Sequence, residues 1–241
     1  MSQGSRKTAG GDSRYSQAAV DVLAAIPLFR VLGAEGMTAA ARAGLCRAYA
    51  PGQAICHQGD PGDHLYAVLR GLVKVVFASE RGDEMVLNIM GPEETFGELA
   101  LLDGSPRSAS VIALKSTSVF VLPRTQLLEL MSRNSALADE FLKLIGKLVR
   151  KLTEQAGDLA FLDLGGRLAK VLLQLSERND HVDGVVLDRG LTQSDLAGMV
   201  GATRPAVNRT LKSFVTRGLI SLDGHTIVFH DLEALRKRSK V

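Results

Sequence analysis

Apolar residues recur along the chain with two different periods, which predicts a β-rich region framed by helices. In residues 17–31 and 37–48 the apolar positions follow helical spacing without internal turn signals, so we expect two short helices there. In residues 49–122 short apolar runs are separated by glycines, a pattern typical of an antiparallel β sandwich or roll. Within this region we expect strands at residues 64–70, 72–79 and 84–90.

A long amphipathic helix is predicted after the β-rich region. Residues 123–131 favour a short helix that begins at Pro123, because the fixed φ of proline suits a first helical turn. Beyond it a stripe has the alternating three- and four-residue spacing of a heptad seam: Ala138, Phe141, Ile145, Leu148, Leu152, Gln155, Leu159 and Leu162. The stripe can pack on the β domain, but its length favours a partner helix and hence a coiled-coil homodimer.

Residues 157–184 predict a hinge and a connection to a second domain. Glycines cluster within residues 157–166, which favours a hinge. Residues 167–178 return to helical spacing, and residues 179–184 are polar and predict a loop.

Residues 191–229 show a helix-turn-helix pattern. Thr192 can cap a first helix with Asp195 three positions on, Gly201 supplies a tight turn, and Thr203 can cap a second helix. Strand-like segments follow at residues 219–222 and 226–229. The intervening Asp223-Gly224 predicts a two-residue hairpin turn, which would add a β wing to the helix pair.

The second helix of this pattern carries side chains suited to DNA. The first residues of such a helix meet base edges in the major groove, and arginine reads guanine while asparagine reads adenine. The predicted DNA-facing residues are Thr192, Thr203, Arg204, Pro205, Asn208, Arg209 and Lys212, of which Thr203 and Lys212 suit phosphates. The alternative is a solvated helix in a small α domain, such as a protein-binding winged helix.

A candidate ligand site lies at residues 96–110, FGELALLDGSPRSAS. Gly97 lets the backbone approach a ligand, a helical turn at residues 99–102 can aim N–H groups at an anion, and Arg107 offers two parallel donors. Glu98 would repel a phosphate but accept a hydrogen bond from a sugar hydroxyl, so the combination suggests a nucleotide. The alternative is an ordinary surface ion pair of Glu98 and Arg107 beside a β-turn.

FGELALL followed by PRSAS resembles the phosphate-binding cassette of cyclic-nucleotide-binding domains, and roughly residues 20–235 resemble transcription regulators of the cAMP receptor protein/FNR (Crp/Fnr) family. The resemblance implies that Glu98 holds the ribose 2′-hydroxyl and Arg107 the cyclic phosphate. It further implies a pocket lined by Gly97, Leu99, Ala100, Ser108 and Ala109. On the long helix, Leu152 and Thr153 match two consecutive hydroxyl residues that contact adenine in the family.

By the same resemblance the fold class is α+β, with a cyclic-nucleotide-binding β-roll, a long dimerisation helix and a C-terminal winged helix-turn-helix domain. The implied domains are a disordered tail (1–16), the nucleotide-binding domain (17–134), the dimerisation helix and hinge (135–162) and the DNA-binding domain (163–241). The implied effector is cAMP. The implied partners are double-stranded DNA, a second copy of the chain and RNA polymerase.

Composition narrows the class of protein further. The 241 residues include two cysteines, Cys46 and Cys56, which favours a reduced, cytosolic protein without disulfides or a cysteine metal site. No apolar run is long enough to span a membrane and the first residues are polar, so we expect neither a span nor a signal peptide. Residues 190–241 hold eight Lys or Arg and four Asp or Glu, a net +4 against +3 for the whole chain. This basic surplus is expected of a segment that meets nucleic acid.

An enzyme is the weakest of the function classes. The sequence shows no nucleophile with a base, no catalytic carboxylate pair and no metal cluster, and His57 and His64 have no metal-ligand spacing. A nucleotide-binding module that acts through protein partners explains the cassette but not the winged helix. A regulator that responds to another ligand, or to none, is the remaining alternative.

The family carries glutamate where this chain has Pro205, so we expect altered preference at one base pair.

Overall fold

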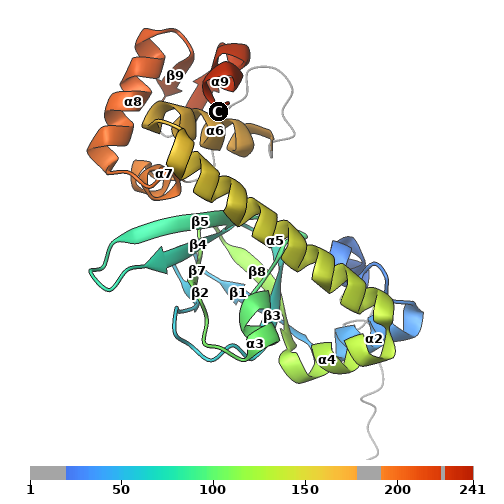
Figure 1. The fold of residues 1–241 in the computed structure, drawn as a ribbon. Helices are drawn as coiled ribbons and strands as arrows, with labels where there is room; N and C mark the ends of the chain where they lie inside the picture. The colour runs from blue at the N-terminus through green and yellow to red at the C-terminus, as the bar shows by residue number, and fades with distance from the viewer. Residues whose placement is uncertain (1–19, 178–190, 224–225, 241) are drawn as a thin grey trace, which may run out of the picture. The chain divides into compact units, whose positions relative to one another are not determined.

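The structure is a computed structural model, and it describes residues 20–177, 191–223 and 226–240 (Figure 1). The predicted tail (1–16) and the loop predicted at residues 179–184 lie outside this part of the chain. Two compact units are present, residues 1–73 with 90–147 and residues 74–89 with 148–241.

The N-terminal helices are shorter than the apolar spacing predicts. Backbone is helical at residues 20–25, a 3₁₀ turn η1 follows at Pro27–Phe29, and helix α2 covers Ala34–Ala43. The helix predicted at residues 37–48 is wrong beyond Ala43, because Leu45–Tyr49 forms strand β1 instead. A Cβ at Gly44 would overlap the Phe120 ring, so the missing side chain lets the backbone pass close to the strand that carries Phe120 as the helix ends.

Two four-stranded sheets confirm the predicted β domain. One has the order β1-β8-β3-β6, and the other has the order β2-β7-β4-β5. The strands of the first are β1, β8 (Thr117–Pro123), β3 (His64–Arg70) and β6 (Thr95–Phe96). Those of the second are β2 (Ala54–Cys56), β7 (Ser110–Ala113), β4 (Val73–Ala78) and β5 (Glu84–Met90). β1 and β3 both pair antiparallel with β8, with Leu45 opposite Val121 and Leu65 opposite Leu122.

The core of the first unit joins the sheet to helices. It includes Phe29, Leu65, Phe120, Leu127 and Phe141, and the Phe29 and Phe120 rings meet edge to face at 6.5 Å. Helix α4 (Arg124–Arg133) follows β8, with Pro123 as its N-cap rather than its first helical residue.

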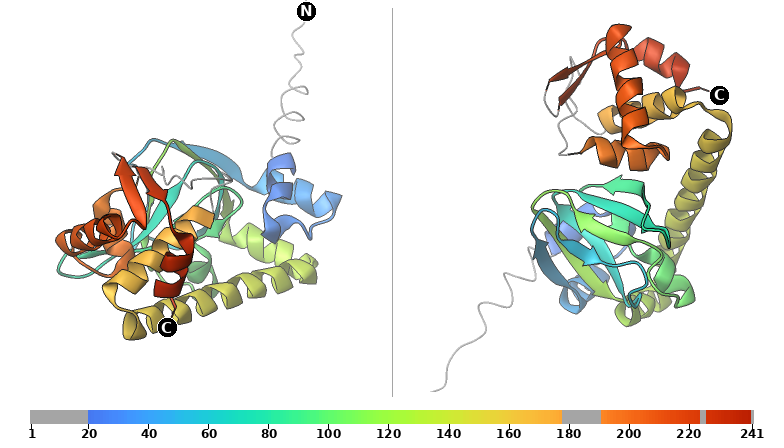
Figure 2. Two further views of the ribbon diagram at one scale, coloured as in Figure 1. Left: turned by 90° about the horizontal axis from the view of Figure 1, so that it is seen from above. Right: turned by 90° about the vertical axis from the view of Figure 1, so that its left-hand side faces the viewer.

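Helix α5 (Ser135–Phe161) is continuous over 27 residues (Figure 2), but the predicted seam mixes two of its faces. Phe141 is 2% exposed within the core of the first unit. The large apolar residues of α5 that stay exposed are Leu142 (64%), Val149 (56%), Leu152 (43%), Leu159 (49%) and, at the end of the helix, Phe161 (74%). The first four fall at heptad spacing, and two of them, Leu152 and Leu159, belong to the predicted seam. Leu142 and Val149 instead lie one residue after the seam positions Phe141 and Leu148, a difference that periodicity alone does not resolve.

In the second unit α5 is followed by α6 (Leu164–Glu177), α7 (Gln193–Val200) and α8 (Arg204–Thr216). The break between α5 and α6 falls at Leu162–Asp163, within the predicted hinge segment 157–166, but the glycines at 157, 165 and 166 lie inside helices. Gly165 instead makes room for another segment, because a Cβ there would lie 2.6 Å from Arg238 Nε.

Strands β9 (Ile220–Asp223) and β10 (Thr226–Phe229) form the predicted wing next to α8 (Figure 2). Asp223 lies in β9 opposite Thr226 rather than in a turn, and Gly224, the other residue of the predicted turn, lies outside the described residues. Helix α9 (Leu232–Arg238), which was not predicted from the apolar spacing, packs on α6.

Candidate functional site

A glycine in the left-handed region opens the candidate ligand site. Gly97 has φ +87° and is the N-cap of the short helix α3 (Glu98–Asp103). A Cβ at Gly97 would overlap Arg107 Nη1 and lie 3.0 Å from the His64 carbonyl oxygen. Both the backbone conformation and the space therefore require glycine here.

The guanidinium of Arg107 is buried and fixed in place. The residue is 5% exposed. Its Nη1 donates to the Gly97 carbonyl at 2.9 Å and its Nη2 to the His64 carbonyl at 2.6 Å. Cζ lies 5.2 Å from the centre of the Tyr66 ring, which stacks on Phe96. A cation held between two carbonyls and a ring keeps one orientation.

Arg107 and Glu98 each retain an enclosed polar atom. Arg107 Nε and Glu98 Oε2 are buried without a hydrogen-bond partner. Burial raises the pKa of Glu98 above its ordinary value, and the nearby Arg107 charge offsets this only in part. No ion pair joins the two side chains in the described part of the chain, and Arg107 is buried, so a surface ion pair does not describe this site.

The other predicted residues of this site differ in their exposure to solvent. Ala100 and Ala109 are buried, whereas Leu99 and Ser108 are exposed. His64, whose carbonyl anchors Arg107, and Tyr66 were not among the predicted site residues. No sequence signal identifies them, because a backbone acceptor and a ring contact depend on the register of β3. Burial, followed by the Arg107 charge, lowers the pKa of the His64 side chain.

Leu152 and Thr153 lie on α5 in the second unit. Leu152 belongs to the exposed apolar row, and the Thr153 hydroxyl donates to the Val149 carbonyl at 2.9 Å. A serine or threonine bonded in this way satisfies its hydroxyl within its own helix.

The first helix of the helix-turn-helix begins with the predicted capping box. Thr192 Oγ1 accepts from the Asp195 N–H at 3.1 Å, and Asp195 Oδ2 accepts from the Thr192 N–H at 2.9 Å. Gly201 ends α7 with φ +61°. Thr192 therefore serves the helix end itself, as its sequence position predicts.

The second helix presents most of its predicted DNA-facing residues to solvent. Thr203, Arg204, Pro205, Arg209 and Lys212 are all exposed. Thr203 caps α8 by accepting from the Ala206 N–H, and Pro205 lies in the first turn, where its missing N–H leaves no bond unmade.

Asn208 differs from these neighbours. It is half-buried, and its Oδ1 is enclosed without a partner. A bidentate contact to adenine needs both amide atoms, so Asn208 must change rotamer to make one.

In the described residues, no group of three or more His, Cys, Asp or Glu could hold a metal ion. None of the helices described is long and apolar enough to cross a membrane.

Both domains match known families. Residues 46–134 match the cyclic nucleotide-binding domain, and residues 166–238 match the Crp-like helix-turn-helix domain. The CRP-like cAMP-activated global transcriptional regulator of Mycobacterium tuberculosis is 34% identical over 191 residues, 78% of this chain and 85% of that protein. The cAMP-activated global transcriptional regulator CRP of Salmonella typhimurium is 34% identical over 183 residues, 73% and 85% of the two chains.

Solved structures agree with these matches. The global regulator CLP of Xanthomonas campestris, described as responsive to c-di-GMP, is 27% identical with a TM-score of 0.70, over 83% of this chain and all of that one. FixK2 of Bradyrhizobium japonicum has a TM-score of 0.75 at 21% identity, over 82% and 98% of the two chains, which shows a shared fold.

A nucleotide-binding β domain joined to a winged helix-turn-helix defines a cyclic-nucleotide-responsive, DNA-binding transcription regulator rather than an enzyme. The chain belongs to the Crp/Fnr family.

Proposed function

We propose that this regulator is controlled by cAMP bound at the α3 cassette. The observation that carries the proposal is the pair of enclosed, unpartnered atoms, Arg107 Nε and Glu98 Oε2. Buried polar atoms are nearly always hydrogen-bonded in native proteins, so a donor and an acceptor left open in one site call for a ligand. A cyclic phosphate meets Arg107, and the ribose 2′-hydroxyl donates to Glu98.

Calorimetric titration with cAMP, cGMP and cyclic di-GMP tests the effector. We expect tight binding of cAMP and a loss of hundreds-fold in Arg107→Ala, about 3–5 kcal/mol for removing a buried charge partner. Arg107→Lys is the matched control, since it keeps the charge but loses the paired donors. Near-wild-type affinity in Arg107→Ala would refute the assignment. Binding of cyclic di-GMP alone would instead favour a regulator that uses another ligand, as described for the Xanthomonas relative.

Selectivity between the bases of cAMP and cGMP depends on the side chains at positions 152 and 153 of α5. With Leu152 in place of a hydroxyl residue and Thr153 bonded within its own helix, adenine loses polar partners, so we propose weak discrimination between cAMP and cGMP. The same titrations test it: Thr153→Val is expected to leave the ratio of the two affinities unchanged.

We propose that the active form is a homodimer assembled through the exposed row on α5, which consists of Leu142, Val149, Leu152 and Leu159. Heptad spacing and exposure together suit a paired helix. Two recognition helices related by a two-fold axis would then bind half-sites about one DNA turn apart.

We propose that Arg204 and Arg209 read guanine and that Thr203 and Lys212 contact phosphates, with RNA polymerase as the further partner. Selecting sites from a random DNA pool tests the reading. Recovery of a two-fold symmetric site supports it, whereas recovery of no symmetric site contradicts it. A cyclic-nucleotide-binding module acting only through protein partners predicts that second result.

A further inference from the structure

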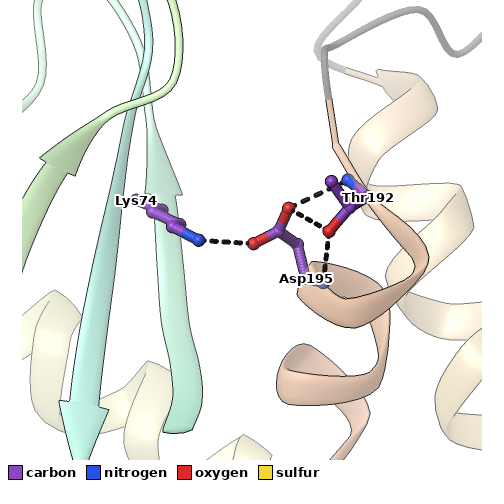
Figure 3. A network of polar contacts seen from close by, with 3 residues as sticks. All are labelled: Lys74, Thr192 and Asp195. Carbon is purple, nitrogen blue, oxygen red and sulfur yellow. Dashed lines mark hydrogen bonds and ion pairs between the residues drawn. The ribbon is translucent and has the colours of Figure 1, made fainter. Parts of the chain in front are cut away.

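A largely buried ion pair joins β4 of the β4–β5 hairpin to the first helix of the helix-turn-helix. Lys74 Nζ lies 2.6 Å from Asp195 Oδ1, with the two side chains 18% and 6% exposed (Figure 3). Asp195 Oδ2 meanwhile accepts from the Thr192 N–H and from the Thr192 hydroxyl. The carboxylate that closes the capping box of α7 thus also anchors β4.

A second contact fixes the same helix on β5. A Cβ at Gly198 would lie 3.0 Å from Val86 Cγ2, 3.1 Å from the Val86 backbone nitrogen and 3.5 Å from the Glu84 carbonyl oxygen. The helix therefore approaches the strand closely because position 198 has no side chain. The ion pair and the close approach lie one helical turn apart, so together they restrict both sliding and rotation of α7 on the hairpin.

Both contacts leave the predicted DNA-facing side open. Arg204, Pro205, Arg209 and Lys212 remain exposed on α8 while the ion pair is formed, and the first turn of α7 is exposed at residues 192–194. Lys74 is therefore not in competition with DNA for the base-reading residues. The contact of α7 with the hairpin therefore holds the helix pair while the predicted DNA-facing residues of α8 stay exposed, so it can orient those residues toward DNA.

We propose that Lys74 is a positioning residue for DNA binding, with the hairpin bracing α7 so that each recognition helix of the dimer is presented at a fixed angle. The inference rests on the proposed homodimer on a symmetric site. A dimer must place two recognition helices in register at once. If α7 is held less firmly on the hairpin, binding to the full symmetric site must therefore also order both helices, which weakens it. A single half-site imposes no such requirement.

The test measures binding of cAMP-saturated full-length protein to three duplexes by fluorescence anisotropy at several salt concentrations. The duplexes are a symmetric site selected from a random pool, one of its half-sites, and random sequence. For Lys74→Met we expect roughly 5- to 30-fold weaker binding to the symmetric duplex alone, with an unchanged salt slope. Lys74→Arg is expected to restore binding, and Lys115→Met, at an exposed lysine far along the chain, to have no effect.

Gly198→Ala disturbs the close contact between α7 and β5 without changing any charged group. Alanine raises helix propensity, so α7 itself is not weakened, yet its Cβ pushes against Val86. We expect the same selective loss on the symmetric duplex. Unchanged binding in both variants overturns the proposal. So does an equal loss on all duplexes with a salt slope lower by about one, which would make Lys74 a phosphate contact.

A readout without DNA separates this inference from the proposed function. If the wild-type protein binds none of the duplexes, the proposed reading of DNA fails. The brace is then judged by amide hydrogen exchange, where Lys74→Met is expected to accelerate exchange in residues 193–200. Exchange identical to the wild type would refute the brace.

Discussion

The guanidinium of Arg107 donates to the carbonyl of Gly97 across 2.9 Å, and the same glycine leaves the space that the guanidinium occupies. A residue that begins α3 therefore sets the position of a cation ten residues later. Because Gly97 supplies both the backbone acceptor and the space for the guanidinium, a substitution at Gly97 is expected to displace Arg107 first.

Gly97→Ala is expected to displace Arg107 and to weaken nucleotide binding by tenfold or more. Gly104→Ala is the matched control: Gly104 also has a positive φ, +72°, but a Cβ there meets nothing within 4 Å. Both changes carry the backbone cost of about 1–2 kcal/mol in thermal unfolding, while only Gly97→Ala should alter calorimetric affinity. Equal affinity loss in the two variants would show that backbone strain, rather than the position of Arg107, controls binding.

Nucleotide affinity is expected to weaken as pH falls. Burial raises the pKa of Glu98 in the free protein, and a hydroxyl bonded to the carboxylate favours its charged form, so the bound protein has the lower pKa. Affinity is therefore fully present above the pKa of the free protein and declines as pH falls through it. Calorimetry across mildly acidic pH measures the decline. Glu98→Gln should bind more weakly and without this pH dependence; a matching decline in the variant would assign it to another group.

Val149→Glu is expected to yield a folded monomer. Val149 is exposed in the single chain, so a charge there leaves the fold intact but places an unpaired ion in the paired helices, at a cost of several kcal/mol. Lys147→Glu, on the same helix and off the apolar row, is the control and should stay dimeric. Light scattering with circular dichroism reports both properties, and a dimeric Val149→Glu would exclude this row as the interface.

Arg209→Ala and Lys212→Ala are expected to weaken DNA binding in different ways. Loss of a base-reading arginine should cost about 1–3 kcal/mol and relax preference at one base pair. Loss of a phosphate contact should weaken all sequences alike and reduce the salt slope by about one unit. Titrations of selected and random duplexes at several salt concentrations distinguish them. An equal loss on both duplexes for Arg209→Ala would mean that this arginine does not read sequence.

Pro205→Glu is expected to change the preferred base at one position of the half-site. Glutamate can accept from cytosine N4, whereas proline cannot, and the first-turn position tolerates either residue. Site selection with both proteins provides the comparison. Identical selected sites would show that position 205 does not contact bases.

The sequence was sufficient to predict those features that depend only on residues close together in the chain. The capping box of Thr192 and Asp195, the left-handed Gly201 and the amphipathic α8 are short-range, so their signals lie within a few positions. The strands at residues 64–70 and 84–90 were likewise predicted to the residue. The cassette motif predicted Glu98 and Arg107 as ligand-binding residues, because glycine, carboxylate and arginine are the groups that a sugar phosphate needs, and the structure encloses an unpartnered polar atom of each.

Tertiary structure decided the features that depend on distant residues. Leu45–Tyr49 has helical spacing but forms a strand because β8 offers it a hydrogen-bonded edge. The α5 stripe divides into buried and exposed faces only once the core of the first unit covers Phe141. The His64 carbonyl that holds Arg107 and the Lys74 that meets Asp195 lie 43 and 121 positions from their partners. The sequence alone determined the kinds of groups at each site and the class of regulator, whereas long-range packing determined which of those groups meet.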